Sequence, residues 1–186
     1  MNLITNTSIL KKEILIYFDN LEIERLRLIN KLNQFSNEQL NFHLPKEWSI
    51  LQILEHLRVA EKQSLKVILK PDIDNQNKIT FFQRLKLSFY IFLLKIGFKF
   101  IAPLHVSRLP ENLDLEILNK KWNENRKEWN DFLFNFDKNI SELAIFPHPI
   151  LGYLSLKMTL EFIFSHQTHH FKKINIILNS FSKLKQ

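Results

Sequence analysis

The chain has 186 residues, 45% of them hydrophobic, and a formal net charge of +7. This length and composition predict a single domain, 1–186, with a substantial core. The absence of cysteine excludes a disulfide framework, a thiolate zinc site and a cysteine nucleophile. With only two glycines, the chain has few of the turn residues that a many-stranded sheet requires. The first residues lack a basic stretch followed by an apolar core, so we expect no secretory signal and a cytoplasmic protein.

The first part of the chain predicts two long helices. Apolar residues recur at steps of three and four residues over about 8–34, which indicates the first helix. Ser49 and Gln52, three residues apart, form a capping box that predicts the start of a second helix over 50–70. Trp48, just before the cap, is placed to pack back on this helix as a hydrophobic staple.

The second part predicts three further helical segments, over 81–101, from 112 or 114 to about 136, and from a cap at Ser155 to about 182. The link 141–153 holds two prolines and a glycine, which predict a fixed turn rather than a helix. No uncharged run in segment 81–101 approaches the roughly 20 residues that span a bilayer. We therefore expect an all-α protein without a transmembrane helix.

The positive charge is concentrated in one part of the chain, because residues 62–110 contain nine basic and two acidic residues. Within segment 81–101, Arg84, Lys95 and Lys99 share one stripe, and apolar residues cover most of the remaining circumference. We expect this segment to cover a core or to form half of a homodimer contact. Docking on an anionic membrane surface is the second interpretation. Nucleic-acid binding is not expected, because no zinc-finger spacing or RNA-binding signature accompanies the charge.

Three histidines are the most informative residues of the sequence. His166 and His170 lie four residues apart on the apolar stripe of the last predicted helix, so both imidazoles should point inward, with Cβ atoms about 5–6 Å apart. His56 lies at the margin of the inward face of the second predicted helix. Two interpretations remain open from spacing alone. The histidines are core residues satisfied by hydrogen bonds, or they share one metal ion.

Three segments carry a resemblance to a known family. They are Trp48–Leu57 (WSILQILEHL), His148–Gly152 (HPILG) and His166–His170 (HQTHH). In this order and over nearly the whole chain, they resemble the DinB-like superfamily, also called YfiT-like. The family shares its name with a DNA polymerase but is unrelated to it.

The resemblance implies an up-and-down four-helix bundle with a long crossover, to which this chain adds the basic, aromatic segment 81–101. It also implies a divalent metal ion held by His56, His166 and His170. We expect zinc or nickel, but imidazole ligands also suit iron and copper, so the sequence does not choose the metal. The family often has a glutamine three residues after the last ligand, where this chain has Lys173.

Members of the superfamily include transferases that use small thiols such as bacillithiol, mycothiol or glutathione, and a thiol-dependent maleylpyruvate isomerase. Many other members have no assigned reaction. The resemblance therefore implies an enzyme that uses a metal ion, and in some members an external low-molecular-weight thiol, on a small-molecule substrate.

The residues leave the catalytic groups unassigned. Glu55 and Glu161 should project away from the histidine faces, and Glu61 is an ambiguous candidate for a general base. His169 is either a group that supports the ligands or a surface residue, and we expect the second. His148 should fix the turn beneath the site rather than bind metal. Two other histidines, His43 and His105, carry no signal.

The function that we expect is activation of a small thiol or a water molecule by the metal ion against a small electrophile. The alternative is a non-catalytic protein, in which the metal cross-links helices and segment 81–101 docks on a partner or a membrane surface. The scaffold alone cannot choose between the two, because function resides in the site.

Overall fold

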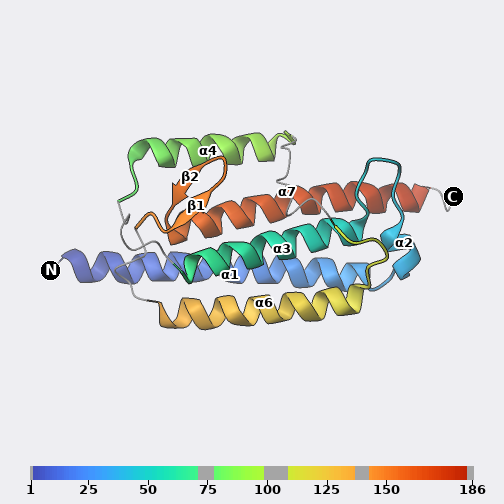
Figure 1. The fold of residues 1–186 in the computed structure, drawn as a ribbon, viewed down its shortest axis with the longest axis horizontal. Helices are drawn as coiled ribbons and strands as arrows, with labels where there is room; N and C mark the ends of the chain where they lie inside the picture. The colour runs from blue at the N-terminus through green and yellow to red at the C-terminus, as the bar shows by residue number, and fades with distance from the viewer. Residues whose placement is uncertain (1, 71–77, 99–108, 137–142, 184–186) are drawn as a thin grey trace.

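The computed structural model describes residues 2–70, 78–98, 109–136 and 143–183. Nearly all regular structure in these ranges is helical, apart from one short hairpin (Figure 1). The elements, in chain order, are α1 (Asn2–Leu32), α2 (Asn37–Asn41), α3 (Ile50–Ile68), α4 (Phe81–Lys95), α6 (Leu115–Asn135), β1 (Phe146–His148), β2 (Gly152–Leu154) and α7 (Leu156–Lys183).

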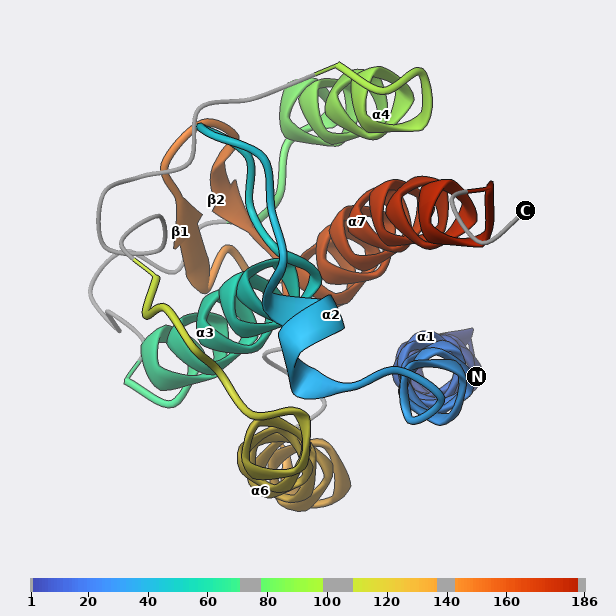
Figure 2. The ribbon, with the colours of Figure 1, turned by 90° about the vertical axis from the view of Figure 1, so that its right-hand side faces the viewer.

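Helices α1, α3, α6 and α7 form a four-helix bundle, which Figure 2 shows from one end. Helices α1 and α7 run in one direction and α3 and α6 in the other, so the connection from α3 to α6 must return along the bundle (Figure 1). That crossover contains α4, which lies outside the bundle against α7. The predicted all-α, up-and-down bundle with a long crossover is confirmed.

Local signals in the sequence set the helix starts. Ser49 accepts the Gln52 backbone N–H at 3.1 Å, while the Gln52 side chain accepts the Ser49 N–H at 3.0 Å, which is the predicted capping box. The Asp114 carboxylate caps α6 by accepting from the Ile117 N–H at 2.9 Å. The predicted starts of α3 and α6 are therefore confirmed.

Helix α4 ends earlier than the predicted range 81–101. Gly97 has a φ of +85°, and the Phe98 N–H donates to the Leu93 carbonyl at 2.9 Å, which is the hydrogen bond of a Schellman motif. The left-handed conformation at Gly97 stops the helix at Lys95. Residues 99–101 of the predicted segment lie outside the described residues.

The predicted turn in link 141–153 is present, but it joins two short strands that were not predicted. β1 and β2 pair antiparallel, with Phe146 opposite Leu154 and His148 opposite Gly152. Gly152 has a φ of +76°, which a residue with a side chain rarely adopts. Strands of three residues are too short to show an alternating pattern, so the sequence did not reveal them.

The bundle interior holds two apolar clusters with a polar layer between them. Leu21, Leu65, Trp129 and Ile163 belong to one cluster. Four other residues from the same helices belong to the second cluster, namely Leu28, Leu57, Trp122 and Phe171. Between these levels, every bundle helix contributes buried polar side chains, among them Arg25, Glu61, Arg126 and Gln167.

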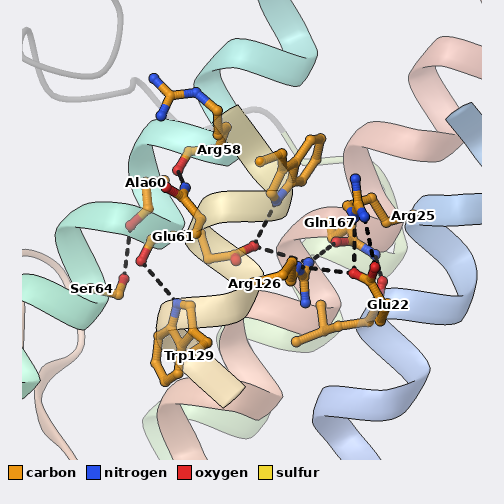
Figure 3. A network of polar contacts seen from close by, with 12 residues as sticks. Glu22, Arg25, Arg58, Ala60, Glu61, Ser64, Arg126, Trp129 and Gln167 are labelled. Carbon is orange, nitrogen blue, oxygen red and sulfur yellow. Dashed lines mark hydrogen bonds and ion pairs between the residues drawn. The ribbon is translucent and has the colours of Figure 1, made fainter. Parts of the chain in front are cut away.

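These four side chains form the polar layer, which Figure 3 shows. Arg126 lies 3.0 Å from both the Glu61 carboxylate and the Gln167 side-chain oxygen, so it ties α6 to α3 and α7. Gln167 in turn donates to the Leu21 carbonyl of α1 at 3.0 Å. Burial raises the pKa of Glu61, and the charge of Arg126 opposes that shift. The layer thus pairs the buried charges of Arg126 and Glu61 across helices, while Arg25 pairs with Glu22 on its own helix.

Removal of the cation from this layer should destabilise the protein strongly. We expect Arg126→Met to lower the free energy of unfolding by about 3–5 kcal/mol, because it leaves the Glu61 carboxylate buried without a counter-charge. Adding Glu61→Gln to that variant should recover a large part of the loss. Urea denaturation measures both effects.

Arg27→Met is the matched control, because Arg27 pairs with Glu24 on the surface, where 72% of the Arg27 side chain is exposed. An exposed pair contributes about 0–1 kcal/mol. If the two Arg→Met variants lose the same free energy of unfolding, the buried pair contributes no more to stability than the exposed pair.

Candidate metal centre

Three imidazoles converge inside the bundle, one from α3 and two from α7. The Nε2 atom of His166 lies 3.3 Å from Nε2 of His56 and 3.1 Å from Nε2 of His170. Nitrogen atoms of all three rings lie within 4.8 Å of one another. The structure therefore brings together the three residues that the sequence and the resemblance selected.

The local fold explains this convergence. The Ser49 cap fixes where α3 begins, and His56 follows two turns later with only 4% of its surface exposed. His166 and His170 occupy successive turns of α7 on one face, as their four-residue spacing requires. Packing of α3 on α7 then places the single histidine opposite the pair.

The donor set fits a divalent cation. Two imidazole nitrogens that bind one zinc ion at about 2.0–2.1 Å with tetrahedral angles lie about 3.4 Å apart, close to the two observed separations. Nδ1 of His170 is buried and makes no hydrogen bond within the part of the chain that the structure describes. A shared ion at the Nε2 atoms would compensate part of the cost of burying these polar rings.

Burial keeps the two histidines of α7 neutral, which is the form that binds metal. The pKa of His166 is lowered well below its usual value by loss of solvent and by the neighbouring histidines. Burial likewise lowers the pKa of His170 to about 2, with a smaller contribution from the positive charge of Lys173. His166 and His170 are both partly rather than fully buried.

Aromatic side chains cover two sides of the site. The Trp48 indole lies 4.9 Å from the His56 ring and stacks on His170 at 6.5 Å, measured between ring centres. Phe162 stacks on His166, with ring centres 5.5 Å apart and planes inclined by 12°. These contacts restrict rotation of the imidazoles and remove water from their faces. Trp48, predicted to staple a helix, therefore also contacts the histidines, a role that the sequence analysis missed.

Two further histidines support the surroundings of the site. His148 accepts the backbone N–H groups of Ile150 and Leu151 at its Nδ1 atom, at 3.2 and 3.1 Å, so it fixes the hairpin turn as predicted. Its ring also lies 4.4 Å from that of Phe162. His169, predicted as a surface residue, is instead partly buried, with Nδ1 2.9 Å from the Leu94 carbonyl of α4. His169 thus joins the crossover helix to the helix that bears two of the three histidines.

The acidic residues take separate roles. Glu55 pairs with Arg58 on its own helix, away from the site, as predicted. Glu61 pairs with Arg126 in the polar layer. Glu61 and His166 also line the same small cavity, which has room for about one water molecule. Lys173 pairs at the surface with Glu47, 2.9 Å away, and so ties α7 to the loop before α3.

The polar layer was also missed by the sequence analysis, although the sequence holds a signal for it. Arg126 lies four residues after Trp122 and three before Trp129, on the apolar stripe of α6. A charged residue on such a stripe predicts a buried ion pair. Its partner Glu61 occupies the corresponding inward position of α3.

The fold and the site together define an all-α bundle protein with three histidines arranged as metal ligands. A family model described as the DinB superfamily matches residues 20–174, so the chain belongs to the DinB superfamily. Comparisons with curated proteins and with solved structures give no match. Within the described residues, no helix is long and apolar enough to cross a membrane.

The hairpin histidine should make stability depend on pH. Burial lowers the pKa of His148 to about 4, from 6.5. An unfolded chain therefore takes up a proton at this residue below about pH 6.5 while the folded chain does not, so stability falls as the pH drops from 6.5 toward 4. In His148→Asn, whose side-chain oxygen still accepts backbone N–H groups without titrating, this fall should be smaller.

Urea denaturation at about pH 7 and about pH 4.5 compares the two proteins. His43→Asn is the control, because the His43 side chain is exposed. If His148→Asn loses as much stability on acidification as the parent chain, the hairpin histidine does not contribute to the pH dependence.

Proposed function

We propose that this protein is a divalent-metal-dependent enzyme in which His56, His166 and His170 hold the ion. The observation that carries the proposal is the convergence of three imidazole rings, whose Nε2 atoms lie within hydrogen-bond distance in two of the three pairs. Three protein ligands leave a position for an exchangeable group, as in catalytic rather than structural zinc sites. Membership in the DinB superfamily supports the same interpretation.

The reaction that we propose is transfer of a small thiol, or of water, to a small electrophile. A divalent ion at this site would lower the pKa of a bound thiol or water, so that more of the nucleophilic anion is present at neutral pH. The thiol proton passes to solvent, a sulfur–carbon bond forms, and the leaving group departs with its electron pair. Because the chain has no cysteine, the thiol must be an external molecule.

The protein's own residues prepare the site for this chemistry. Burial holds His166 and His170 neutral. Trp48 and Phe162 cover the faces of the histidine rings and keep water from them. Water exclusion strengthens electrostatic interactions with a charged nucleophile. These features favour a reactive centre over an ion that only links α3 to α7, which is the alternative function.

Metal content tests the first part of the proposal. After incubation with zinc or nickel and removal of free ion, we expect about one bound ion per chain. We also expect the melting temperature to rise with ion concentration, because the ion binds the folded chain. His166→Ala with His170→Ala should abolish both effects. His43→Ala should leave them unchanged, since His43 lies outside the site.

Absence of bound metal in the parent chain, with these ions in excess, would overturn the metal site. It would leave three core histidines with hydrogen bonds among their rings.

Activity tests the second part. The metal-loaded protein is mixed with a chloronitrobenzene as the electrophile and with bacillithiol, mycothiol or glutathione in turn. We expect release of chloride with at least one thiol, and a loss of about a hundredfold or more in His56→Ala, because ligand removal abolishes the site. Metal binding without activity toward any thiol or water would favour the non-catalytic alternative.

A further inference from the structure

Helix α4 presents an apolar face to the outside of the molecule. It lies against α7 and β2 and is the outermost helix in the end view of Figure 2. Its inward side buries Leu87, Tyr90, Ile91 and Leu94 in the core. Segment 81–101 was expected to cover a core or to form half of a homodimer contact. In the described part of the segment, the four buried residues cover the core.

The opposite side of α4 is a continuous apolar stripe, which we call the outer stripe. At 100° per residue its members fall within about a quarter to a third of the circumference, centred opposite the buried residues. Exposed fractions reach 80% for Phe81, 63% for Phe82 and 62% for both Phe89 and Ile96. The members of the outer stripe are Phe81, Phe82, Leu85, Phe89, Phe92 and Ile96.

Cations flank the outer stripe on both edges. Arg84 and Lys95 lie along one edge and Lys86 along the other, and all three are exposed. The Lys86 ammonium lies 5.3 Å from the centre of the Phe82 ring. From Lys78 to Pro110 the sequence contains no acidic residue. The charged residues of α4 that border the outer stripe are therefore all basic.

We propose that the outer stripe docks α4 on the surface of an anionic lipid bilayer. An interfacial helix buries an apolar face at the boundary between headgroups and acyl chains, and cations at its edges meet the lipid phosphates. The outer stripe supplies the apolar face, and Arg84, Lys86 and Lys95 supply the edges. At about 1.5 Å per residue α4 is about 22 Å long, which suits a helix that lies in the interface.

Charge argues against the other occupants of this face. A second copy would place Arg84, Lys86 and Lys95 near the same cations of its partner, and like charges oppose such a contact. The rim of a protein interface is polar and of mixed composition, whereas both edges here are basic and the centre is dominated by phenylalanine. An anionic lipid surface complements both the apolar centre and the basic edges.

Vesicle co-sedimentation tests this proposal with the full chain. We expect binding to vesicles of phosphatidylcholine mixed with phosphatidylserine, weaker binding to phosphatidylcholine alone, and a decrease with added salt. Phe82→Ser with Phe89→Ser should weaken binding roughly tenfold or more, because two exposed rings no longer enter the bilayer. Lys86→Gln with Lys95→Gln should weaken it by about 25-fold, at about fivefold for each cation.

Matched controls lie on other helices. Phe134→Ser with Ile176→Ser removes two exposed apolar side chains from α6 and α7. Lys120→Gln with Lys127→Gln removes the same net charge from the exposed side of α6. Both pairs should bind vesicles as the parent does. Circular dichroism should show equal helix content in all variants, since every substituted side chain is exposed.

Three outcomes would overturn the proposal. The first is a parent chain that does not bind the phosphatidylserine vesicles, and the second is equal loss of binding in the control variants. The third is a dimer in light scattering that Phe82→Ser with Phe89→Ser converts to a monomer, which would assign the outer stripe to a second copy. None of these outcomes bears on the metal site, because none of the substituted residues contacts its histidines.

Discussion

Three imidazoles that face one another in the bundle interior set the central constraint of this structure. Burial lowers the pKa values of His166 and His170, and at nitrogen separations of 3.1 and 3.3 Å each contact between the rings allows at most one donor. Trp48 and Phe162 hold the rings in this arrangement from the outside. Contacts among the three rings alone therefore contribute little to stability. A divalent cation would accept a lone pair from one nitrogen of each ring and so would bind all three at once.

The polar layer supports this constraint from within the bundle. His56 and Glu61 lie on the same helix, and Gln167 is adjacent in sequence to His166. Arg126 binds both Glu61 and Gln167. These two contacts fix the positions of α3 and α7 along the bundle axis, and therefore also the positions of their histidines. A slide of α3 by one turn would separate the buried charges of Glu61 and Arg126, at a cost of several kcal/mol, and a slide of α7 would break the hydrogen bond to Gln167. We infer that the buried ion pair contributes to the precision of the site as much as to stability.

The parts of this structure that the sequence predicts are those that depend on local chemistry. The Ser49 capping box and the Asp114 cap are contacts within three residues, and the His166–His170 pair follows from helix geometry alone. The meeting of His56 with that pair depends on how distant helices pack, and the family resemblance supplied it. Contacts that involve neither a cap nor a repeat were not predicted. They include the stacking of Trp48 on His170, the pairing of the two short strands, and the ion pair between Glu61 and Arg126.

Helix α4 shows why an amphipathic pattern alone could not assign its faces. Apolar residues cover most of its circumference, so the sequence does not say which of them contact the bundle. Packing against α7 selects a narrow stripe around Leu87, Tyr90 and Leu94, and the phenylalanine-rich side is left outside. The Leu94 carbonyl also contacts His169, which directly precedes His170, so the helix that carries the outer stripe is in direct contact with the helix that carries two of the three histidines. A bilayer at the outer stripe would therefore be separated from α7 only by α4 itself, because α4 packs directly on α7.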